Sequence, residues 1–465
     1  GSNQAVQFVA EKPTGEKSNY FLGDDPASWK MGVGIYGSIL GRGLYPGVDI
    51  RYYSSGDRMK YDLLLAPGAD PTNILMTYDG VDKLSIKNGH LVVSTSVGES
   101  RELPPYAYQI IGGQKKEVAC TYMIKGNQVS FSVKAYDKSA ALTIDPVLVF
   151  STYTGSRSSN WGFTAAPGPD GSLYAGGIVF GAGFPLSTGA FQTGFGGGTG
   201  QGNISGVDVG LTRFSPDGRT RVFSTYLGGS GDEFPHSIFV DPQGNPVILG
   251  RTTSSNFPTR NSNKVGALGG TDIFVTKLSS DGTILLGGIL IGGAGLDGAN
   301  MDGTISPGPK ALLYNYGDNA RSEVILDKSN NVYIASSTTS SDFPIRNASQ
   351  ATFGGGQDGV LMKFSPDLST IFFSTFLGGS DDDAAFVLAL NPLNNAIYVA
   401  GATKSSNMPG IKTGTIGPSL LGGVDGFVTV FSNTGARGIC SFLGTDATDI
   451  VYGIQFDQKG FPYVM

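Results

Sequence analysis

The stretch FSTYLGGSGDEF, residues 223–234, occurs again in this chain as FSTFLGGSDDDAAF, residues 373–386. Weaker copies begin at Phe150 (FSTYTGS), Gly287 (GGILIGGAGLDG) and Cys440 (CSFLGTDATD). Recurrence of one phrase at intervals of several tens of residues is typical of propeller blades and other repeat arrays. The phrase therefore predicts a protein built from repeated structural units over much of its length.

Each repeat has the pattern of four short strands. In the second repeat, HSIFVDPQGNPVILGRT (236–252) is two apolar runs around the turn DPQGN, and DIFVTKLSSDGTILLGGIL (272–290) is two more around SSDG. Asp, Asn and Gly favour such turns because they form local side-chain hydrogen bonds or adopt positive φ. Four strands in up-and-down order form one propeller blade. FSTYLGG is then the outermost strand of a blade, and GSGDE crosses to the innermost strand of the next.

The repeats run from residue 147 to residue 465 and comprise four full blades and part of a fifth. The fifth begins at Asp449, and the sequence stops at Met465 inside its second strand. We therefore expect a portion of a longer protein. VLVFSTY (147–153) precedes the first full blade, so we expect an outer strand of an incomplete ring, beside a blade that further sequence completes.

Residues 1–146 lack the repeat but contain strand-forming stretches such as VDIRYYSSGDRMKYDLLL and KKEVACTYMIKGNQVSFSVKAY, joined by turns such as NG, GG and GN. They predict an all-β domain of about ten short strands. The predicted fold class is all-β: an N-terminal β-rich domain, residues 1–146, followed by a β-propeller of four-stranded blades, residues 147–465.

Composition excludes several classes of protein. Charged residues make up only 15% of the chain and the net charge is −6, so no basic surplus is present for nucleic-acid binding. No apolar run approaches the roughly 20 residues that span a bilayer, so no membrane span is expected. The two cysteines, Cys120 and Cys440, fall in different predicted domains and are expected to be free, buried thiols.

The pattern STYLGGSGDE…VDPQGN…TSSNFP…GTDIFVTKL resembles the bacterial β-propeller repeats known as SBBP, and the resemblance covers roughly residues 147–465. The segment YPGVDIRYYSSGDRMKYDLLLAPGADP resembles a domain of unknown function that commonly precedes these repeats. Proteins of this layout are frequent among Bacteroidota, and many carry a C-terminal domain for type IX secretion or gliding motility. The resemblance implies a protein that is secreted or displayed on the outer cell surface, with secretion machinery among its partners.

Few residues offer nucleophile or metal chemistry. His90 lies in the hairpin turn KNGHL, and His236 lies on an inner strand, where we expect a partly buried core residue. A Ser-His-Asp triad or a histidine-ligated zinc would need one of them, and the G-x-S-x-G motif is missing. GVGIYG (32–37) matches a dinucleotide-binding glycine pattern, but its flanks are not a strand and a helix. No cofactor is predicted.

Carboxylates in the crossing loops are the remaining candidates. They are Asp232, Glu233, Asp297, Asp381, Asp382 and Asp383. Equivalent loops of a propeller surround one face of its channel, so these side chains could form a rim that binds Ca²⁺ or a cationic group, because hard cations prefer oxygen ligands. The alternative, which we favour, is that each aspartate accepts hydrogen bonds from amides of its own loop.

A long insertion, GGAGLDGANMDGTISPGPKALLYNYGDNARSE, separates the second and third blades. It carries Tyr314, Tyr316 and Arg321 among glycines. Long loops on a rigid scaffold often carry function. The tyrosines could stack on a sugar or anchor a protein partner. A loop that covers the mouth of the channel is an equal alternative.

Two functions remain open. The first is a non-catalytic binding, adhesion or scaffold protein with a protein or polysaccharide partner at the cell surface, linked by the resemblance to gliding or type IX secretion. The second is a carbohydrate-active enzyme that uses a cleft on a propeller face. Propellers host both kinds of function, so the fold does not decide. We favour the first, since the sequence shows no catalytic constellation.

Overall fold

The computed structural model describes residues 6–20, 30–55, 58–95, 98–146, 156–198, 206–216, 218, 220–260, 263–300, 312–313 and 318–465. The chain divides into two compact units, Gly1–Ser151 and Thr152–Met465. The described residues form β-strands and two short 3-10 helices, η2 (Pro71–Asn73) and η4 (Asp318–Ala320), with no α-helix among them. The fold class is all-β, as predicted.

The described residues of the first unit form three antiparallel sheets. The largest has the order β1 (Gln7–Tyr20), β2 (Lys30–Tyr45), β3 (Val48–Ser55), β4 (Arg58–Leu65), β13 (Leu142–Pro146), β9 (Pro105–Ile111) and β10 (Gln114–Val118). The two smaller sheets are β11 (Cys120–Lys125), β12 (Gln128–Val133) and β5 (Met76–Thr77), and β6 (Lys83–Lys87), β7 (His90–Thr95) and β8 (Gly98–Glu102). β1 and β2 are longer than the short strands expected. GVGIYG lies inside β2, so it forms no phosphate-binding turn.

The core of the first unit receives every second residue of its strands. Leu63 and Leu65 of β4 are buried, as are Leu142 and Ile144 of β13. This spacing of two is the period at which side chains point to one face of a sheet. Cys120 belongs to the same core, is free, and burial raises the pKa of its thiol to about 11.

The second unit consists of successive sheets that match the predicted blades. The first blade is β14 (Asn160–Pro167), β15 (Leu173–Val179), β16 (Asp208–Phe214) and β17 (Arg221–Leu227). The second is β18 (Glu233–Val240), β19 (Pro246–Thr252), β21 (Asp272–Leu278) and β22 (Leu285–Gly292), with β20 (Lys264–Gly266) added in parallel to β22. The third is β23 (Glu323–Leu326), β24 (Val332–Thr338), β25 (Asp358–Phe364) and β26 (Ile371–Leu377). The fourth is β27 (Asp383–Leu390), β28 (Ile397–Thr403), β29 (Asp425–Phe431) and β30 (Arg437–Leu443), and β31 (Ile454–Phe456) and β32 (Pro462–Val464) pair as a two-stranded sheet.

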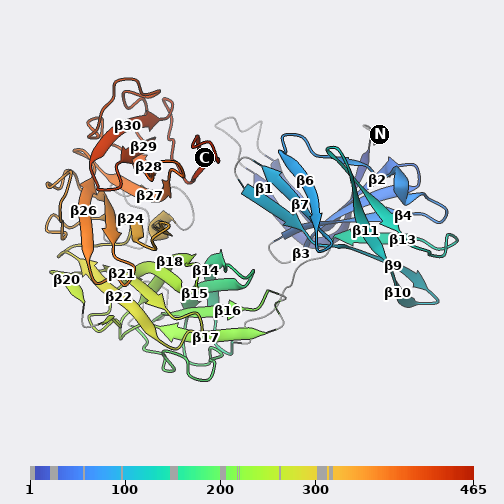
Figure 1. The fold of residues 1–465 in the computed structure, drawn as a ribbon, viewed down its shortest axis with the longest axis horizontal. Helices are drawn as coiled ribbons and strands as arrows, with labels where there is room; N and C mark the ends of the chain where they lie inside the picture. Colours follow the sequence, from blue (N-terminus) through green and yellow to red (C-terminus); the bar gives the residue numbers. More distant parts are fainter. Residues whose placement is uncertain are drawn as a thin grey trace. The chain divides into compact units, whose positions relative to one another are not determined.

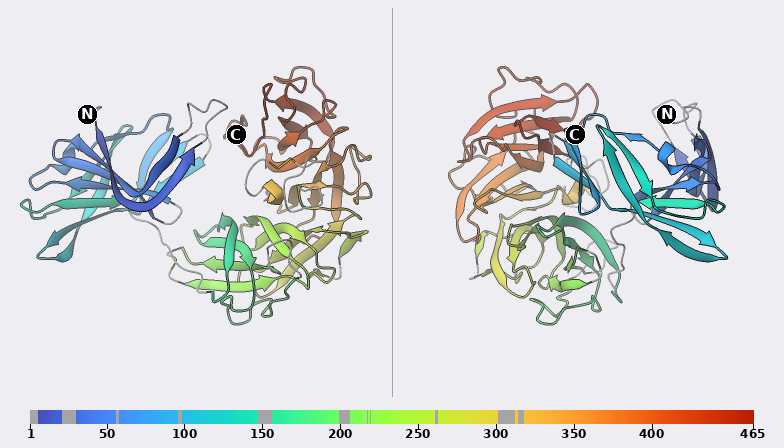
Figure 2. Two further views of the ribbon diagram at one scale, coloured as in Figure 1. Left: turned by 180° about the vertical axis from the view of Figure 1, so that it is seen from behind. Right: turned by 45° about the vertical axis from the view of Figure 1, so that its right-hand side comes forward.

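The first strands of successive blades contact one another in the order β14, β18, β23, β27 and β31. Figure 1 shows β14, β18 and β27 on the inner side of their blades, with the blades following one another from green to red, and the left view of Figure 2 shows the same arrangement from behind. The first strand of each blade is therefore the innermost one. The repeated phrase FSTYLGG forms β17, the last strand of its blade, and GSGDE leads to β18, which confirms the prediction. VLVFSTY, expected as an outer strand, lies outside the described residues.

The hairpin turns use the chemistry that the sequence predicted. Asp241 accepts the N–H groups of Gln243 and Asn245 in the turn between β18 and β19. Asp327 does the same for Ser329 and Asn331 between β23 and β24.

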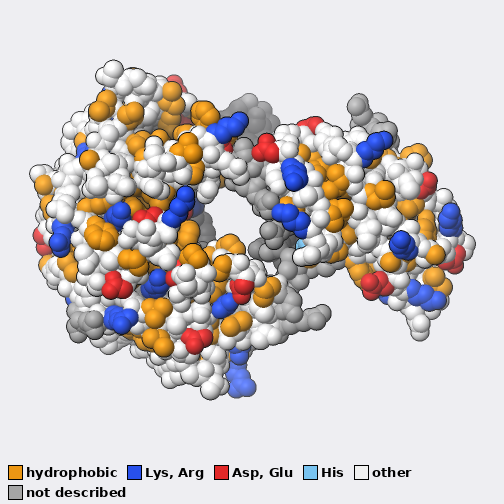
Figure 3. All heavy atoms as spheres, in the orientation of Figure 1, with side chains coloured by type: hydrophobic (Ala, Val, Ile, Leu, Met, Phe, Trp, Pro, Cys, Tyr) orange, Lys and Arg blue, Asp and Glu red, His pale blue; other side chains and the backbone are white. Residues whose placement is uncertain are grey.

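On the face drawn in Figure 3, acidic and basic side chains are interspersed among uncharged ones. No helix in the described part of the chain is long and apolar enough to cross a membrane.

Candidate functional site

A buried carboxylate occupies the start of the inner strand at three successive blade junctions. Glu233 accepts hydrogen bonds from the N–H of Gly229 (3.1 Å) and the hydroxyls of Thr252 (2.5 Å) and Ser254. These hydroxyls lie at and just beyond the end of β19, the strand that pairs with β18. Each carboxylate oxygen of Glu233 therefore has a donor from the protein.

The same three donors recur at the next two junctions. Asp297 accepts from the N–H of Gly293 (2.7 Å) and the hydroxyls of Thr338 and Ser340 (3.0 Å). Asp383 accepts from the N–H of Gly379 (2.6 Å) and the hydroxyls of Thr403 and Ser405 (2.8 Å). These equivalences show that Asp297 is the counterpart of Glu233 and Asp383.

A second buried aspartate lies beside each of these carboxylates, at the start of the third strand of the preceding blade. The pairs are Asp208 with Glu233, Asp272 with Asp297, and Asp358 with Asp383. Burial, together with a smaller effect of the negative partner, raises the pKa of Glu233 to about 8 and that of Asp383 to about 7. The N–H groups of Gly196 and Gly197 donate to Asp208, and those of Gly354 and Gly355 donate to Asp358.

The two glycines of the repeated phrase are required by this arrangement. A methyl group on Gly228 would lie 2.5 Å from Glu233 Oε2 and 2.8 Å from Asp208 Oδ1. A methyl group on Gly229 would lie 2.6 Å from the Cβ atom of Ser254. The loop therefore passes between the carboxyl pair and the strand end, where only a residue without a side chain fits.

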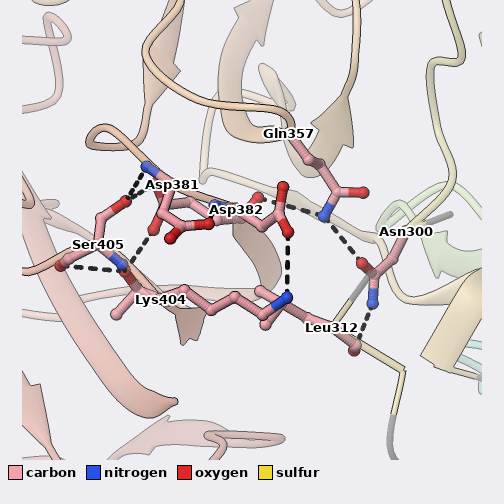
Figure 4. Close-up of polar contacts among 9 residues, drawn as sticks. Asn300, Leu312, Gln357, Asp381, Asp382, Lys404 and Ser405 are labelled. Atoms are coloured by element: carbon pink, nitrogen blue, oxygen red, sulfur yellow. Dashed lines mark hydrogen bonds and ion pairs between the residues drawn. The ribbon is translucent and has the colours of Figure 1, made fainter. Parts of the chain in front are cut away.

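The other predicted acidic residues surround these junctions and do not form one site. Asp232 accepts the N–H of Val207 (3.1 Å), and Asp382 forms an ion pair with Lys404 (3.1 Å). Asp381 is exposed, and its carboxylate accepts the N–H of Asp382 (2.8 Å), as Figure 4 shows. Asp232 and Asp382 are equivalent residues of the repeat, because each directly precedes the buried carboxylate of its junction. Asp381 lies one residue earlier and is not their equivalent. Among the described residues, no group of three or more His, Cys, Asp or Glu side chains is arranged to hold a metal ion. Ca²⁺ binding by these loops therefore has no support from the geometry and stays a prediction.

The described ends of the long insertion are anchored inside the second unit. Asn300 donates to the carbonyl of Leu312 (2.7 Å) and accepts from the side chain of Gln357 (2.8 Å), as Figure 4 shows. Leu312 is buried against Phe386 and other apolar residues of the fourth blade. Within this insertion, the residues that follow Asp297 separate it from β23, so they interrupt the inner strand of the third blade.

The second end of the insertion reaches two further blades. The carbonyl of Asn319 accepts from Arg251 at the end of β19 (2.7 Å). Tyr452, which precedes β31, donates its hydroxyl to Asp318 Oδ2 (3.0 Å). Arg321 lies 3.6 Å from Asp318 Oδ1 and 4.8 Å from the centre of the Tyr452 ring. Of the predicted insertion residues, Arg321 thus lies at the centre of the unit, while Tyr314 and Tyr316 fall outside the described residues.

These inner elements line an open cavity of about 400 Å³. Residues from every blade line it, including Phe163, His236, Arg321, Glu323, Phe386 and Tyr452. A second cavity of about 370 Å³ shares Ser237 and Glu323 with the first. The cavity is the candidate site, because it brings several polar and aromatic side chains from distant parts of the sequence together.

A repeated β-bulge aims side chains into this cavity. In three of the inner strands, the pairing with the neighbouring strand skips one residue: Phe163 in β14, His236 in β18 and Phe386 in β27. An extra residue in one strand bends that strand and redirects its side chain. The three blades thus present the same position of the repeat to the cavity, with Phe in two blades and His in one.

His236 is the polar member of this set. Both of its ring nitrogens are buried and have no hydrogen-bond partner among the residues that the structure describes. Burial and the nearby charge of Arg251 hold the pKa of His236 well below its usual value, so the imidazole is neutral at neutral pH. The sequence indicated a core residue here. Comparison of position 236 with positions 163 and 386 of the other repeats is the signal that could have revealed its place in the cavity.

Glu323 and Ser237 connect the inner strands along the cavity wall. The N–H of Leu388 donates to Glu323 (2.6 Å), and the N–H of Val324 donates to the hydroxyl of Ser237 (3.3 Å). Burial raises the pKa of Glu323 to about 7. Neither residue was singled out from the sequence, because neither belongs to the crossing loops.

Comparisons with solved structures return distant neighbours. One is a protein of unknown function from Dyadobacter fermentans DSM 18053, 9% identical over 100% of this chain and 94% of that chain, with a TM-score of 0.32. Another is a mutant of NanB sialidase from Streptococcus pneumoniae, 10% identical over 86% of this chain and 79% of that chain, with a TM-score of 0.34. A third is a glycoside hydrolase, 10% identical over 65% of this chain and 62% of that chain, with a TM-score of 0.28. At these scores the neighbours carry no argument about function.

Comparison with curated proteins found no match. Among protein families, residues 1–147 match the family described as a domain of unknown function, DUF7948. The first unit is therefore similar to DUF7948 domains.

Proposed function

We propose that the protein is a non-catalytic binding protein that takes part of its ligand into the central cavity of the propeller. His236 supports this proposal most directly, because its two ring nitrogens are buried without a partner among the described residues. Buried polar atoms of native proteins nearly always have partners, and an exception calls for an explanation. A ligand that bonds to this imidazole supplies one.

We further propose that the protein acts outside the cell, in adhesion, gliding or as a scaffold, with a protein or polysaccharide partner at the cell surface. The support is the resemblance of its repeats to SBBP propellers and of its first domain to the domain that precedes them. Brief protease treatment of intact producing cells is expected to remove the protein. Full protection of the protein until the cells are lysed would contradict this location.

A carbohydrate-active enzyme is the second candidate, and Glu323 is the observation that favours it. A carboxyl group with a pKa raised to about 7 beside a cavity has the character of a general acid. Asp318, the carboxylate of the same region, is already held by Tyr452, and hydrolysis with two carboxyl groups needs both at the scissile bond.

The two candidates differ in whether the ligand is changed. The full chain is incubated with immobilised polysaccharides, bound protein is measured, and released sugars are quantified. Binding that persists without released product, and that is reduced in His236→Ala but not in His90→Ala, is the expected result. His90 is the matched control because it is the other histidine of the chain and lies on β7 of the first unit. Release of product that stops in Glu323→Gln would establish the enzyme instead.

A further inference from the structure

We propose that the central cavity binds an uncharged sugar unit of a glycan, and that the adjoining cavity holds the next part of the same chain. This inference rests on the binding function proposed above and adds the chemical class of the ligand. Three features of the described residues carry it: an aromatic wall, the hydrogen-bonding character of His236, and the balance of charge around the cavity.

The aromatic wall comes from Phe163, Phe386 and Tyr452. The rings of Phe386 and Tyr452 are stacked, with centres 5.9 Å apart and planes inclined by 4°. A sugar ring has apolar C–H faces and a rim of hydroxyls, so it fits a site where aromatic surfaces alternate with a few polar groups. The cavity has this composition.

His236 matches a hydroxyl group better than a charged group. A neutral imidazole has one N–H donor and one acceptor nitrogen, and a sugar hydroxyl both donates and accepts. An anion would use only the donor, and a cation would use only the acceptor. Both nitrogens of His236 lack a partner among the described residues, so the ligand that satisfies both is one that donates and accepts.

Charged groups of both signs lie in and beside the cavity: Arg321 and Arg251 are basic, and Asp318 and Glu323 are acidic. The charge of Arg321 is opposed by Asp318 at 3.6 Å, and the imidazole of His236 is neutral. Arg251, which lies behind His236, has its guanidinium over the ring of Phe234 (4.3 Å) and donates to the carbonyl of Asn319. Burial of a charged ligand is costly without an opposite charge to pair with it, so this cavity favours an uncharged one.

The second cavity gives the ligand a direction and a length. It continues from Ser237 and Glu323 along the inner strands to Leu388 and Phe456. Each of the two cavities lies within the range of roughly 300–1,000 Å³ that is usual for small ligands. A ligand that fills both is an oligosaccharide, and we expect its affinity to exceed that of the corresponding monosaccharide.

The test is an array of uncharged, acidic and basic oligosaccharides that covers the common linkages, followed by calorimetric titration of each ligand that binds. The central variant is His236→Phe. Phe163 and Phe386 occupy the same bulge in the first and fourth blades, so phenylalanine is compatible with the fold at this position. His90→Phe is the matched control. We expect binding of uncharged oligosaccharides, a loss of affinity on the order of tenfold or more in His236→Phe, and none in His90→Phe.

Each other outcome overturns a defined part of the inference. Binding of acidic or basic oligosaccharides alone, with dependence on His236, would retain the binding function and reject the uncharged class. Binding of uncharged oligosaccharides that is equal in the wild type and His236→Phe would reject the cavity as the site. Absence of binding to every oligosaccharide would reject the sugar as ligand. The melting temperature of each variant, measured in parallel, shows that it is folded.

Discussion

At the scale of single residues, two buried threonines of the second blade differ in one respect. Thr252 donates its hydroxyl to Glu233, whereas Thr276 has a buried hydroxyl without a partner among the described residues. We expect Thr252→Val to lower the free energy of unfolding by about 1–3 kcal/mol, because a buried acceptor loses its donor. Thr276→Val is expected to be neutral or slightly stabilising, because an unpaired polar group is replaced by a methyl group. Denaturant titration measures both, and equal losses would contradict the role given to Thr252.

The sequence identified some of the important residues but not their roles. Glu233, Asp297 and Asp383 stood out because they recur in the crossing loops. Their hydroxyl donors lie about 20 residues or more further along the chain, so that the pairing becomes visible only when the strands are in register. His236 looked like a core residue in the sequence because nothing local marks it as part of a bulge. A bulge depends on how two strands pair, and this pairing is visible only in the structure.

At the scale of elements, the crossing loop tolerates no side chain at its second glycine. A methyl group on Gly229 would lie 2.6 Å from the Cβ atom of Ser254, and one on Gly379 would lie 2.5 Å from the Cβ atom of Ser405. We expect Gly229→Ala to lower the free energy of unfolding by about 1–3 kcal/mol, the usual cost of overpacking. Gly194→Ala is the control, since nothing lies within 4 Å of a methyl group there. Thermal unfolding of both variants checks this, and a loss no larger for Gly229→Ala than for Gly194→Ala would contradict it.

The strands themselves were the most predictable elements. Four strands in each full blade, their turns, and the place of FSTYLGG at the outer edge follow from alternating apolar runs and turn residues. The course of the insertion was not predictable, because the contacts of Leu312 with the fourth blade and of Arg321 with Tyr452 join segments far apart in the sequence. Patterns with a period of two residues describe local structure and contain no information on such contacts.

At the scale of the whole molecule, the junctions repeat one electrostatic feature. Six buried carboxyl groups lie in three pairs between successive blades, and burial is the first cause of the raised pKa of each. The pKa is raised to about 6 for Asp208, Asp272, Asp297 and Asp358, to about 7 for Asp383 and to about 8 for Glu233. Because the feature recurs, its effect on stability accumulates over the propeller.

We expect the melting temperature of the protein to fall as the pH rises from about 5 to about 8. Asp and Glu of an unfolded chain titrate near pH 4, so the folded state binds more protons than the unfolded state between these limits. Stability therefore decreases as the pH rises through the folded pKa values, and it is greatest toward the acidic end of the window. Two sets of groups oppose this trend toward acid pH. Hydrogen bonds lower the pKa of Asp170 and Asp367 to about 2, and burial holds the pKa of His236 well below that of a histidine in the unfolded chain. Calorimetry between pH 4.5 and 8 measures the slope, and Glu233→Gln, which removes the group with the highest pKa, is expected to make it shallower. A melting temperature that rises from pH 5 to pH 8 would contradict the prediction that the buried pairs dominate the pH dependence of stability.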